Sequence, residues 1–153
     1  MGSLIAKLVG QATDLRVEIA TEQAGQPLVG QVLDLPGNPI VREGLNVDLS
    51  TVDTVVDFTV PSSTMKVLRQ AQLKKCAAVV GTTGFSPEQM AEIYTIAEDI
   101  PVLLSPNMSI GVNMFFRTVQ DLTKRLEGYD VEVIEIHHRS EEHTSELQSR
   151  HNL

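Results

Sequence analysis

Short apolar runs alternate with amphipathic segments through the middle of the chain. The runs at 54–58, 77–80, 102–104 and 131–136 are rich in branched apolar residues and have the length of strands. The segments between them, 62–75, 87–98 and 110–126, predict helices, and the second begins with the capping signal Ser86-Pro87-Glu88-Gln89. Because such alternation is typical of βαβ units, it predicts an α/β fold with a parallel sheet and flanking helices.

The first 46 residues follow a looser pattern. Leu4, Ile5, Leu8 and Val9 recur at helical spacing and predict a short helix near residues 2–12. The apolar and polar alternation at 15–20 predicts a strand. Residues 23–46 are rich in glycine and proline, which predicts a loop with room for one short strand.

Composition narrows the classes of function. The 153 residues suit one domain, or one domain and a piece of a second. A formal net charge of −8, without a basic cluster, argues against a nucleic-acid partner. No apolar run approaches the roughly 20 residues that span a bilayer, and the N-terminus lacks a secretion signal, so we expect a cytoplasmic protein without a membrane partner. Cys76 lies alone in an apolar run, which predicts a small buried hydrophobic residue rather than a nucleophile.

Residues 140–153 break the pattern. They are polar, with Leu147 and Leu153 as the only large apolar residues, and they resemble the in-frame translation of a sequencing-library adapter. We interpret them as a non-native tail, with a disordered terminus as the alternative. In either case we expect this tail to pack on nothing, because its apolar surface is too small to offset the entropy of ordering it.

Polar residues follow several of the predicted strands, where ligands of parallel sheets bind. Residues 81–85 connect a buried strand to a capped helix, so their glycines and threonines suit a polar ligand; an ordinary tight turn is the alternative. Glu22 follows the first predicted strand, where a carboxylate could accept both ribose hydroxyls of an adenosine; a solvated surface charge is the alternative. Such an acid lies about 20 residues after a Gly-rich turn, which places Met1 and Gly2 inside that turn and predicts that the strand before it is absent.

Two adjacent histidines close the last predicted strand. His137 and His138 point to opposite sides of a regular strand, so one could donate a proton while the other binds a carboxylate or packs. A polar strand end is the alternative. No thiolate is near them, which makes a metal site a poor hypothesis. The sequence has no nucleophile elbow and no Walker loop, so serine hydrolase and ATPase functions have no specific support.

Four segments in order resemble the dihydrodipicolinate reductase family, over roughly residues 1–139. They are Val56-Asp57-Phe58-Thr59, Val80-Gly81-Thr82-Thr83-Gly84-Phe85, the stretch from Ser105 to Asn113, and the stretch from Glu132 to Arg139. Each segment alone is modestly specific, and the four at compatible spacing are highly specific. The family reduces 4-hydroxy-tetrahydrodipicolinate in lysine and diaminopimelate synthesis.

The resemblance implies a Rossmann-like domain that uses NADH or NADPH as cofactor and a small dicarboxylate as substrate. It assigns His137 as the catalytic acid and His138 as a substrate-binding residue. It assigns cofactor binding to Met1, Gly2, Glu22, Gly81, Thr82, Thr83, Ser105, Pro106, Asn107 and Met108. Gln23 stands where some members carry an arginine for the NADP phosphate, which weakly favours NADH or dual use. Full-length members are usually homotetramers.

The chain also departs from the family pattern. Glu141 stands where the family has a catalytic lysine, and a Ser-Gly-Thr segment and the substrate domain are missing. We therefore expect a truncated dinucleotide-binding domain at 1–136, the start of a substrate domain at 137–139 and the non-native tail at 140–153. Such a fragment is expected to be inactive. The alternatives are another Rossmann-type dehydrogenase, such as a sugar or homoserine dehydrogenase relative, and a non-catalytic nucleotide-binding fragment.

Overall fold

The computed structural model describes residues 1–45 and 47–130, together with residues 132 and 134. The chain divides into two compact units, residues 1–105 and 106–153, and each is described by itself. The predicted strand at 131–136, the histidine pair and residues 140–153 fall largely or wholly outside the described residues. The structure therefore does not test the predictions made for them.

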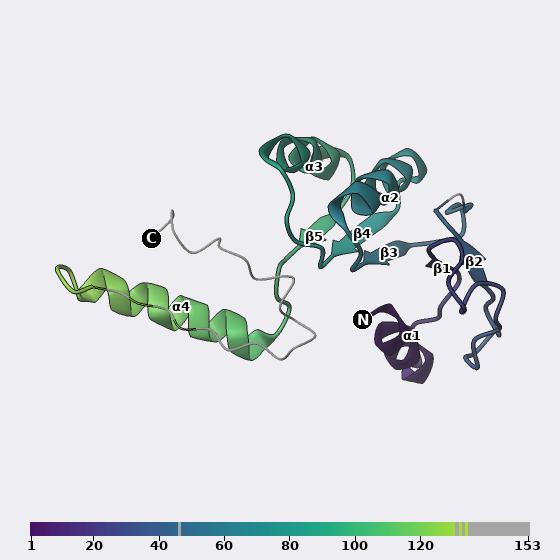
Figure 1. Cartoon of the computed structure of the whole chain (residues 1–153), viewed down its shortest axis with the longest axis horizontal. Helices are drawn as coiled ribbons and strands as arrows, with labels where there is room; N and C mark the ends of the chain where they lie inside the picture. The colour runs from purple at the N-terminus through teal and green to yellow at the C-terminus, as the bar shows by residue number, and fades with distance from the viewer. Residues whose placement is uncertain (46, 131, 133, 135–153) are drawn as a thin grey trace. The chain divides into compact units, whose positions relative to one another are not determined.

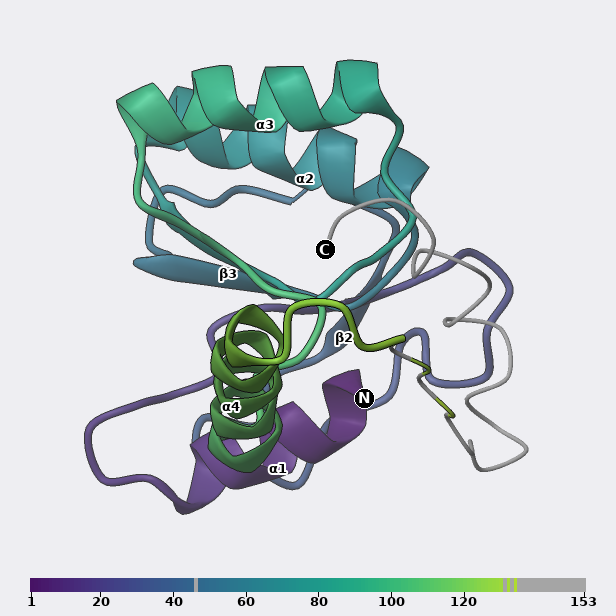
Figure 2. The same ribbon diagram turned by 90° about the vertical axis from the view of Figure 1, so that its left-hand side faces the viewer.

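The centre of the first unit is a parallel three-stranded sheet. Its strands lie in the order β3 (Thr54–Asp57), β4 (Ala77–Val80) and β5 (Val102–Leu104). The connections between them are α2 (Pro61–Lys74) and α3 (Pro87–Asp99), which lie side by side over one face of the sheet (Figures 1 and 2). The predicted α/β architecture is thus confirmed, with strand and helix bounds within about one residue of those expected.

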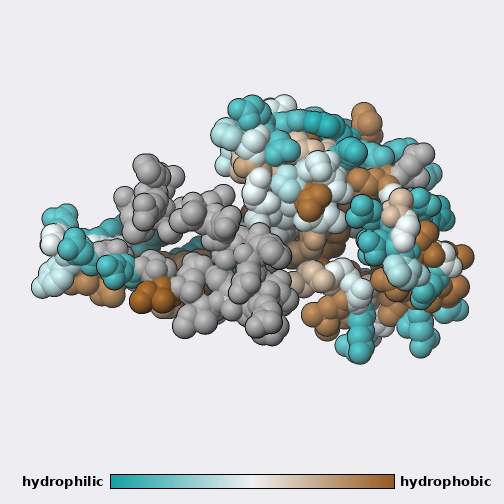
Figure 3. Space-filling view, viewed as in Figure 1, coloured by the Kyte–Doolittle hydropathy of each residue, from teal (hydrophilic) through white to brown (hydrophobic). Residues whose placement is uncertain are grey.

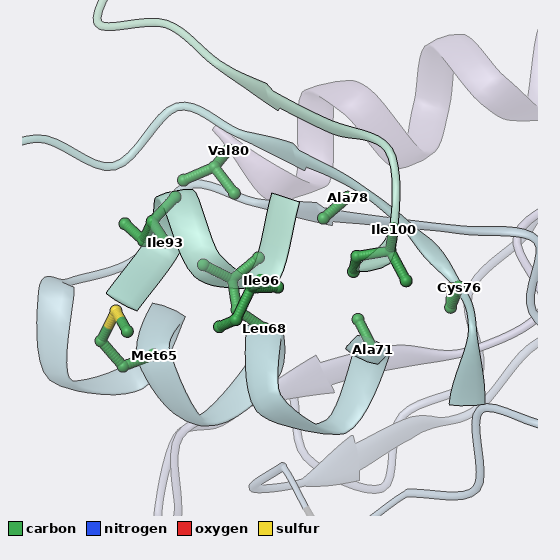
Figure 4. Close-up of a cluster of buried hydrophobic side chains, with 9 residues drawn as sticks. All are labelled: Met65, Leu68, Ala71, Cys76, Ala78, Val80, Ile93, Ile96 and Ile100. Atoms are coloured by element: carbon green, nitrogen blue, oxygen red, sulfur yellow. The ribbon is translucent and has the colours of Figure 1, made fainter. Parts of the chain in front are cut away.

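The hydrophobic core fills the space between this sheet and the two helices. Register places Val55, Ala78 and Val102 in one row of the sheet, and Val80 beside Leu104 in the next. The helices contribute Leu68 and Ile96, which are 0% and 2% exposed (Figure 4). The whole cluster consists of Met65, Leu68, Ala71, Cys76, Ala78, Val80, Ile93, Ile96 and Ile100.

Local signals in the sequence set the ends of these helices. The Ser86 hydroxyl accepts a hydrogen bond from the Gln89 amide at 3.3 Å, and the Gln89 side chain accepts one from the Ser86 amide at 2.9 Å. This reciprocal pair is the predicted capping box. Helix α2 begins with Pro61, whose missing amide hydrogen costs nothing in the first turn, and stops at Lys75 with a left-handed φ of 57°.

The N-terminal part of the first unit contains α1 (Gly2–Gln11) and a separate two-stranded parallel sheet. The helix is the one predicted near 2–12. The strand predicted at 15–20 is wrong in its bounds, because β1 spans Ala20–Glu22 and residues 15–19 are unpaired. A strand forms only where a neighbour pairs with it, and β2 (Val41–Glu43) faces β1 only over those three residues. Strand β2 also lies within residues 23–46, where the sequence predicted a loop that could contain one short strand.

The second unit contains one described helix, α4 (Ile110–Arg125). It begins where the Ser109 hydroxyl accepts a hydrogen bond from the Val112 amide at 3.4 Å. One stripe of the helix is apolar and exposed, including Phe115 at 63% and Phe116 at 53% (Figure 3). Among the described residues, no helix combines the length and apolar character needed to cross a bilayer.

Replacing the most buried helix residue tests this description of the core. Leu68→Ala should lower the free energy of unfolding by about 2–5 kcal/mol, because it leaves a cavity among the residues of α3 and β4. Chemical denaturation monitored by circular dichroism measures the change. The matched control is Leu73→Ala in the same helix, where the side chain is 81% exposed and the expected change is within about 0.5 kcal/mol. Equal effects of the two substitutions would contradict this packing.

Candidate functional site

The carboxyl ends of β3, β4 and β5 lie at the same edge of the sheet. Their main chains stay paired beyond the strands themselves. The Gly81 amide donates to the Asp57 carbonyl at 2.8 Å, and the Ser105 amide donates to the Val80 carbonyl at 3.1 Å. The residues after β3 and β4 are therefore held side by side, in the position where parallel sheets bind ligands.

A network of hydroxyl and carboxyl groups joins the ends of β3 and β4. Asp57 Oδ1 accepts hydrogen bonds from the Thr59 amide at 2.8 Å and from the Thr59 hydroxyl at 2.6 Å. The same Thr59 amide lies 3.1 Å from Thr82 Oγ1, and Thr64 Oγ1 of α2 lies 2.9 Å from Thr82 Oγ1. Asp57, Thr64 and Thr82 are at most 4% exposed. Since these bonds are buried or partly buried, they fix the turn after β3 and the turn after β4 relative to one another.

Gly81 is required by the close approach of an aromatic ring. A Cβ added at Gly81 would overlap the Phe58 side chain, so any larger residue would force the ring or the turn to move. Farther along the turn, Gly84 has a φ of +83°, which L-residues with a side chain rarely adopt. Because these two glycines have no side chains, the segment after β4 presents main-chain groups next to the threonine hydroxyls.

The other predicted cofactor-binding residues of the first unit lie at its second sheet and at α1. Glu22 is the last residue of β1, half-buried, and its Oε1 accepts a hydrogen bond from the Gln23 amide at 2.8 Å. Met1 precedes α1, and its carbonyl accepts from the Leu4 amide at 3.0 Å. Gly2 is the first helical residue, with no heavy atom within 4 Å of an added Cβ. Among the described residues, no hydrogen bond joins Met1, Gly2 or Glu22 to the network of Asp57.

Ser105 ends the first unit, whereas Pro106, Asn107 and Met108 begin the second. Asn107 organises the start of α4: its Oδ1 accepts from the Ser109 amide at 2.9 Å, and its carbonyl accepts from the Asn113 side chain at 2.8 Å. These bonds give Asn107 a structural task at the helix start. Cofactor binding by these four residues stays a prediction.

The network contains residues that the sequence did not single out as site residues. Asp57 and Thr59 were visible as the polar end of a predicted strand and as part of a family motif, but neither was assigned a role, because a strand-end Asp-Phe-Thr has no chemical signature of its own. Thr64 gave no signal, since a threonine one turn into an amphipathic helix looks like any partly buried position. Only the folded chain brings its hydroxyl to Thr82.

Cys76 takes no part in this network. It is 2% exposed, and burial raises the pKa of its thiol, which keeps it protonated at neutral pH. The prediction of a small buried hydrophobic residue is confirmed. Within the described part of the chain, no three His, Cys, Asp or Glu side chains are grouped as metal ligands would be.

A parallel sheet with flanking helices and polar strand ends defines an α/β domain of the Rossmann-like class. The family described as "Dihydrodipicolinate reductase, N-terminus" matches residues 1–108. The chain belongs to this family, as the resemblance of the four motifs had indicated.

Curated relatives of the chain are named 4-hydroxy-tetrahydrodipicolinate reductase. A 4-hydroxy-tetrahydrodipicolinate reductase from Nitrosomonas europaea is 41% identical over 144 residues, which cover 91% of this chain and 54% of that protein. The reductase of Syntrophobacter fumaroxidans is 39% identical over 145 residues, with coverage of 91% and 54%. That of Geotalea daltonii is 38% identical over 144 residues, with coverage of 90% and 54%. The chain thus spans about half the length of the curated relatives it matches.

The contact between Gly81 and Phe58 yields a direct test. Gly81→Ala should destabilise the chain by about 1–3 kcal/mol, because the methyl group would overlap the Phe58 ring. In a Phe58→Ala background the same change should cost much less, and denaturation of the four chains gives the coupling energy. Gly2→Ala, which adds a methyl group in open space, is the matched control. A coupling energy near zero would contradict the packing of Phe58 on Gly81.

Proposed function

We propose that this chain is the cofactor-binding part of an NADH- or NADPH-dependent reductase that acts on 4-hydroxy-tetrahydrodipicolinate in lysine and diaminopimelate biosynthesis. The family match over residues 1–108 carries the proposal, since that range includes the network at the ends of β3 and β4. The names of the relatives supply the substrate and the reaction.

The donor and acceptor groups of the chain fit a pyridine dinucleotide. Glu22 ends β1 with a half-buried carboxylate, the group that accepts hydrogen bonds from a ribose diol. The turn after β4 combines the bare backbone of Gly81 with Thr82 and Thr83, which suits a flat, polar ring. Met1 and Gly2 stand at the N-terminus of α1, where free amides favour a pyrophosphate.

Each of these residues has a separate task in the proposed reductase. Glu22 accepts hydrogen bonds from the adenosine ribose, and Gly81, Thr82 and Thr83 hold the nicotinamide half together with residues 105–108. When bound, the dinucleotide supplies the hydride. The absence of an arginine at Gln23 favours NADH, or use of both cofactors.

The proton of the reduction is assigned to His137. An imidazole titrates near neutral pH and therefore suits a general acid. His138 is assigned to the substrate carboxylates. Both lie outside the described residues, so the sequence motif from Glu132 to Arg139 supports these two assignments.

The remaining expectations concern the rest of the protein. We place the boundary of the cofactor domain at residue 136, the start of the substrate domain at 137–139 and a non-native tail at 140–153. A complete protein of this kind would be cytoplasmic and homotetrameric. Glu141, in place of the family lysine, would repel a dicarboxylate, and this chain alone is proposed to be inactive.

The family match favours this reductase over a sugar or homoserine dehydrogenase. A non-catalytic nucleotide-binding role is the second candidate. For this chain in isolation it is favoured because the sequence contains the cofactor-binding motifs, whereas Glu141 stands in place of the family lysine. NADH binding without substrate-dependent oxidation would be its signature.

Turnover measured in a hybrid protein tests the proposal. The hybrid joins residues 1–139 to the parts of the Nitrosomonas europaea reductase that this chain does not match, where the family pattern places the lysine and the Ser-Gly-Thr segment. We expect the hybrid to oxidise NADH in the presence of substrate and the chain alone to be inactive. His137→Gln in the hybrid should lower turnover by roughly 10²–10⁴-fold, the usual contribution of a general acid.

Near-normal turnover of the His137→Gln hybrid would show that another group donates the proton. Substrate-dependent NADH oxidation by the chain alone would overturn the proposed inactivity. Failure of the folded hybrid to turn over would contradict the assigned reaction.

A further inference from the structure

Two glutamates lie side by side at the carboxyl end of the small parallel sheet. Register pairs Glu22, the last residue of β1, with Glu43, the last residue of β2. Residues in register on neighbouring parallel strands belong to the same face of the sheet, on strands about 4.8 Å apart. The Gly44 amide donates to the Glu22 carbonyl at 2.8 Å, which keeps the two chains together beyond the strands. The two carboxylates therefore share one face at the end of the sheet.

No cation of the described chain balances these two charges. The ion pairs of the described residues join other carboxylates, and neither Glu22 nor Glu43 takes part in one. Arg42 precedes Glu43 in β2, and the alternation of a strand places it on the opposite face, in register with Thr21. Because like charges this close repel one another, the pair forms a locally negative surface at the end of the small sheet.

Such a surface distinguishes a ribose diol from a ribose phosphate. A carboxylate accepts hydrogen bonds from the hydroxyls of a diol, which carries no charge. A phosphate ester at the 2′ position replaces one of these donors and carries about 1.5 to 2 negative charges near neutral pH. Gln23, which follows Glu22, is neutral and does not offset them. Both carboxylates therefore repel the phosphate, whereas neither repels the diol.

We infer that Glu43 is a specificity-determining residue whose charge, added to that of Glu22, repels the 2′-phosphate of NADPH and makes NADH the preferred cofactor of this chain. The inference rests on the proposed function, because it takes Glu22 as the group that meets the adenosine ribose. Glu43 is exposed and lies on the neighbouring strand, so it acts through its charge and needs no hydrogen bond to the ribose. Salt screens a repulsion between exposed charges, whereas it does not remove a steric clash.

Calorimetric titration of this chain with NADH and with NADPH tests the effect of charge. At about 0.01 M salt we expect NADPH to bind roughly tenfold more weakly than NADH, and the difference to shrink at about 1 M salt. Glu43→Gln should strengthen NADPH binding by roughly three- to tenfold and change NADH binding by less than about twofold. The matched control, Glu98→Gln, removes the same charge from an exposed position of α3 and should leave both affinities unchanged.

Amide exchange without any cofactor tests whether the two carboxylates interact. The Gly44 amide, which donates to the Glu22 carbonyl, reports on the end of the small sheet. Its protection factor should rise by roughly two- to fivefold in Glu43→Gln, because the repulsion between the strands is relieved. In a chain that already carries Glu22→Gln, the same change should bring no further gain. Exchange of the Ala78 amide in the central sheet reports whether each variant is folded.

An effect of Glu43→Gln on Gly44 that is the same with and without Glu22→Gln would show that the carboxylates do not interact and would overturn the inference, whatever the chain binds. NADPH binding as tight as NADH binding would also overturn it, and so would an unchanged NADPH affinity in Glu43→Gln. A preference for NADH that resists salt would assign the discrimination to steric exclusion and would overturn it as well. Interacting carboxylates in a chain that binds neither dinucleotide would contradict the proposed function, and with it the role of Glu43 in cofactor choice.

Discussion

The packing of α2 and α3 against one face of the β3–β4–β5 sheet is the interaction on which the rest of the structure depends. Nine buried side chains form this layer. They belong to the two helices, to the central strand β4 and to the segments that connect these elements. None of the short strands would be stable by itself, since each has only three or four residues. Burial of the helices' apolar stripes therefore holds the three strands in register.

This register produces the chemistry at the end of the sheet. Once β3 and β4 are aligned, Asp57 lies beside Val80, and the turn with Thr59 meets the turn with Thr82. The core also sets the position of α2, whose first turn brings Thr64 to the same hydroxyl. Buried polar groups in such a place are costly unless they are paired, so a network of this kind is tolerated only where the surrounding core fixes its geometry.

The sequence predicted the central units well because their signals are local and agree with one another. The apolar run at 77–80, the capping box of Ser86 and Gln89, and the helical spacing that follows all favour the same arrangement. The strand predicted at 15–20 was misplaced because pairing with β2, a distant segment, decides where a strand begins. For the site, the sequence identified Gly81 and Thr82, and the motif contained Asp57. It could not show that Thr64 reaches the network or that one Asp57 oxygen has no hydrogen-bond partner among the residues that the structure describes, since both depend on tertiary contacts.

Native-state hydrogen exchange tests most directly whether the α2–α3 layer over β3–β4–β5 is the part that the rest depends on. The Ala78 amide donates to Pro101 and the Gly81 amide to Asp57 within this layer, whereas the Gly44 amide donates to Glu22 in the small sheet. If the layer is the stable centre, the first two amides exchange only through global unfolding, with opening free energies equal to that from denaturation, and Gly44 exchanges through smaller openings. Exchange of Ala78 and Gly81 as fast as that of Gly44 would contradict the account.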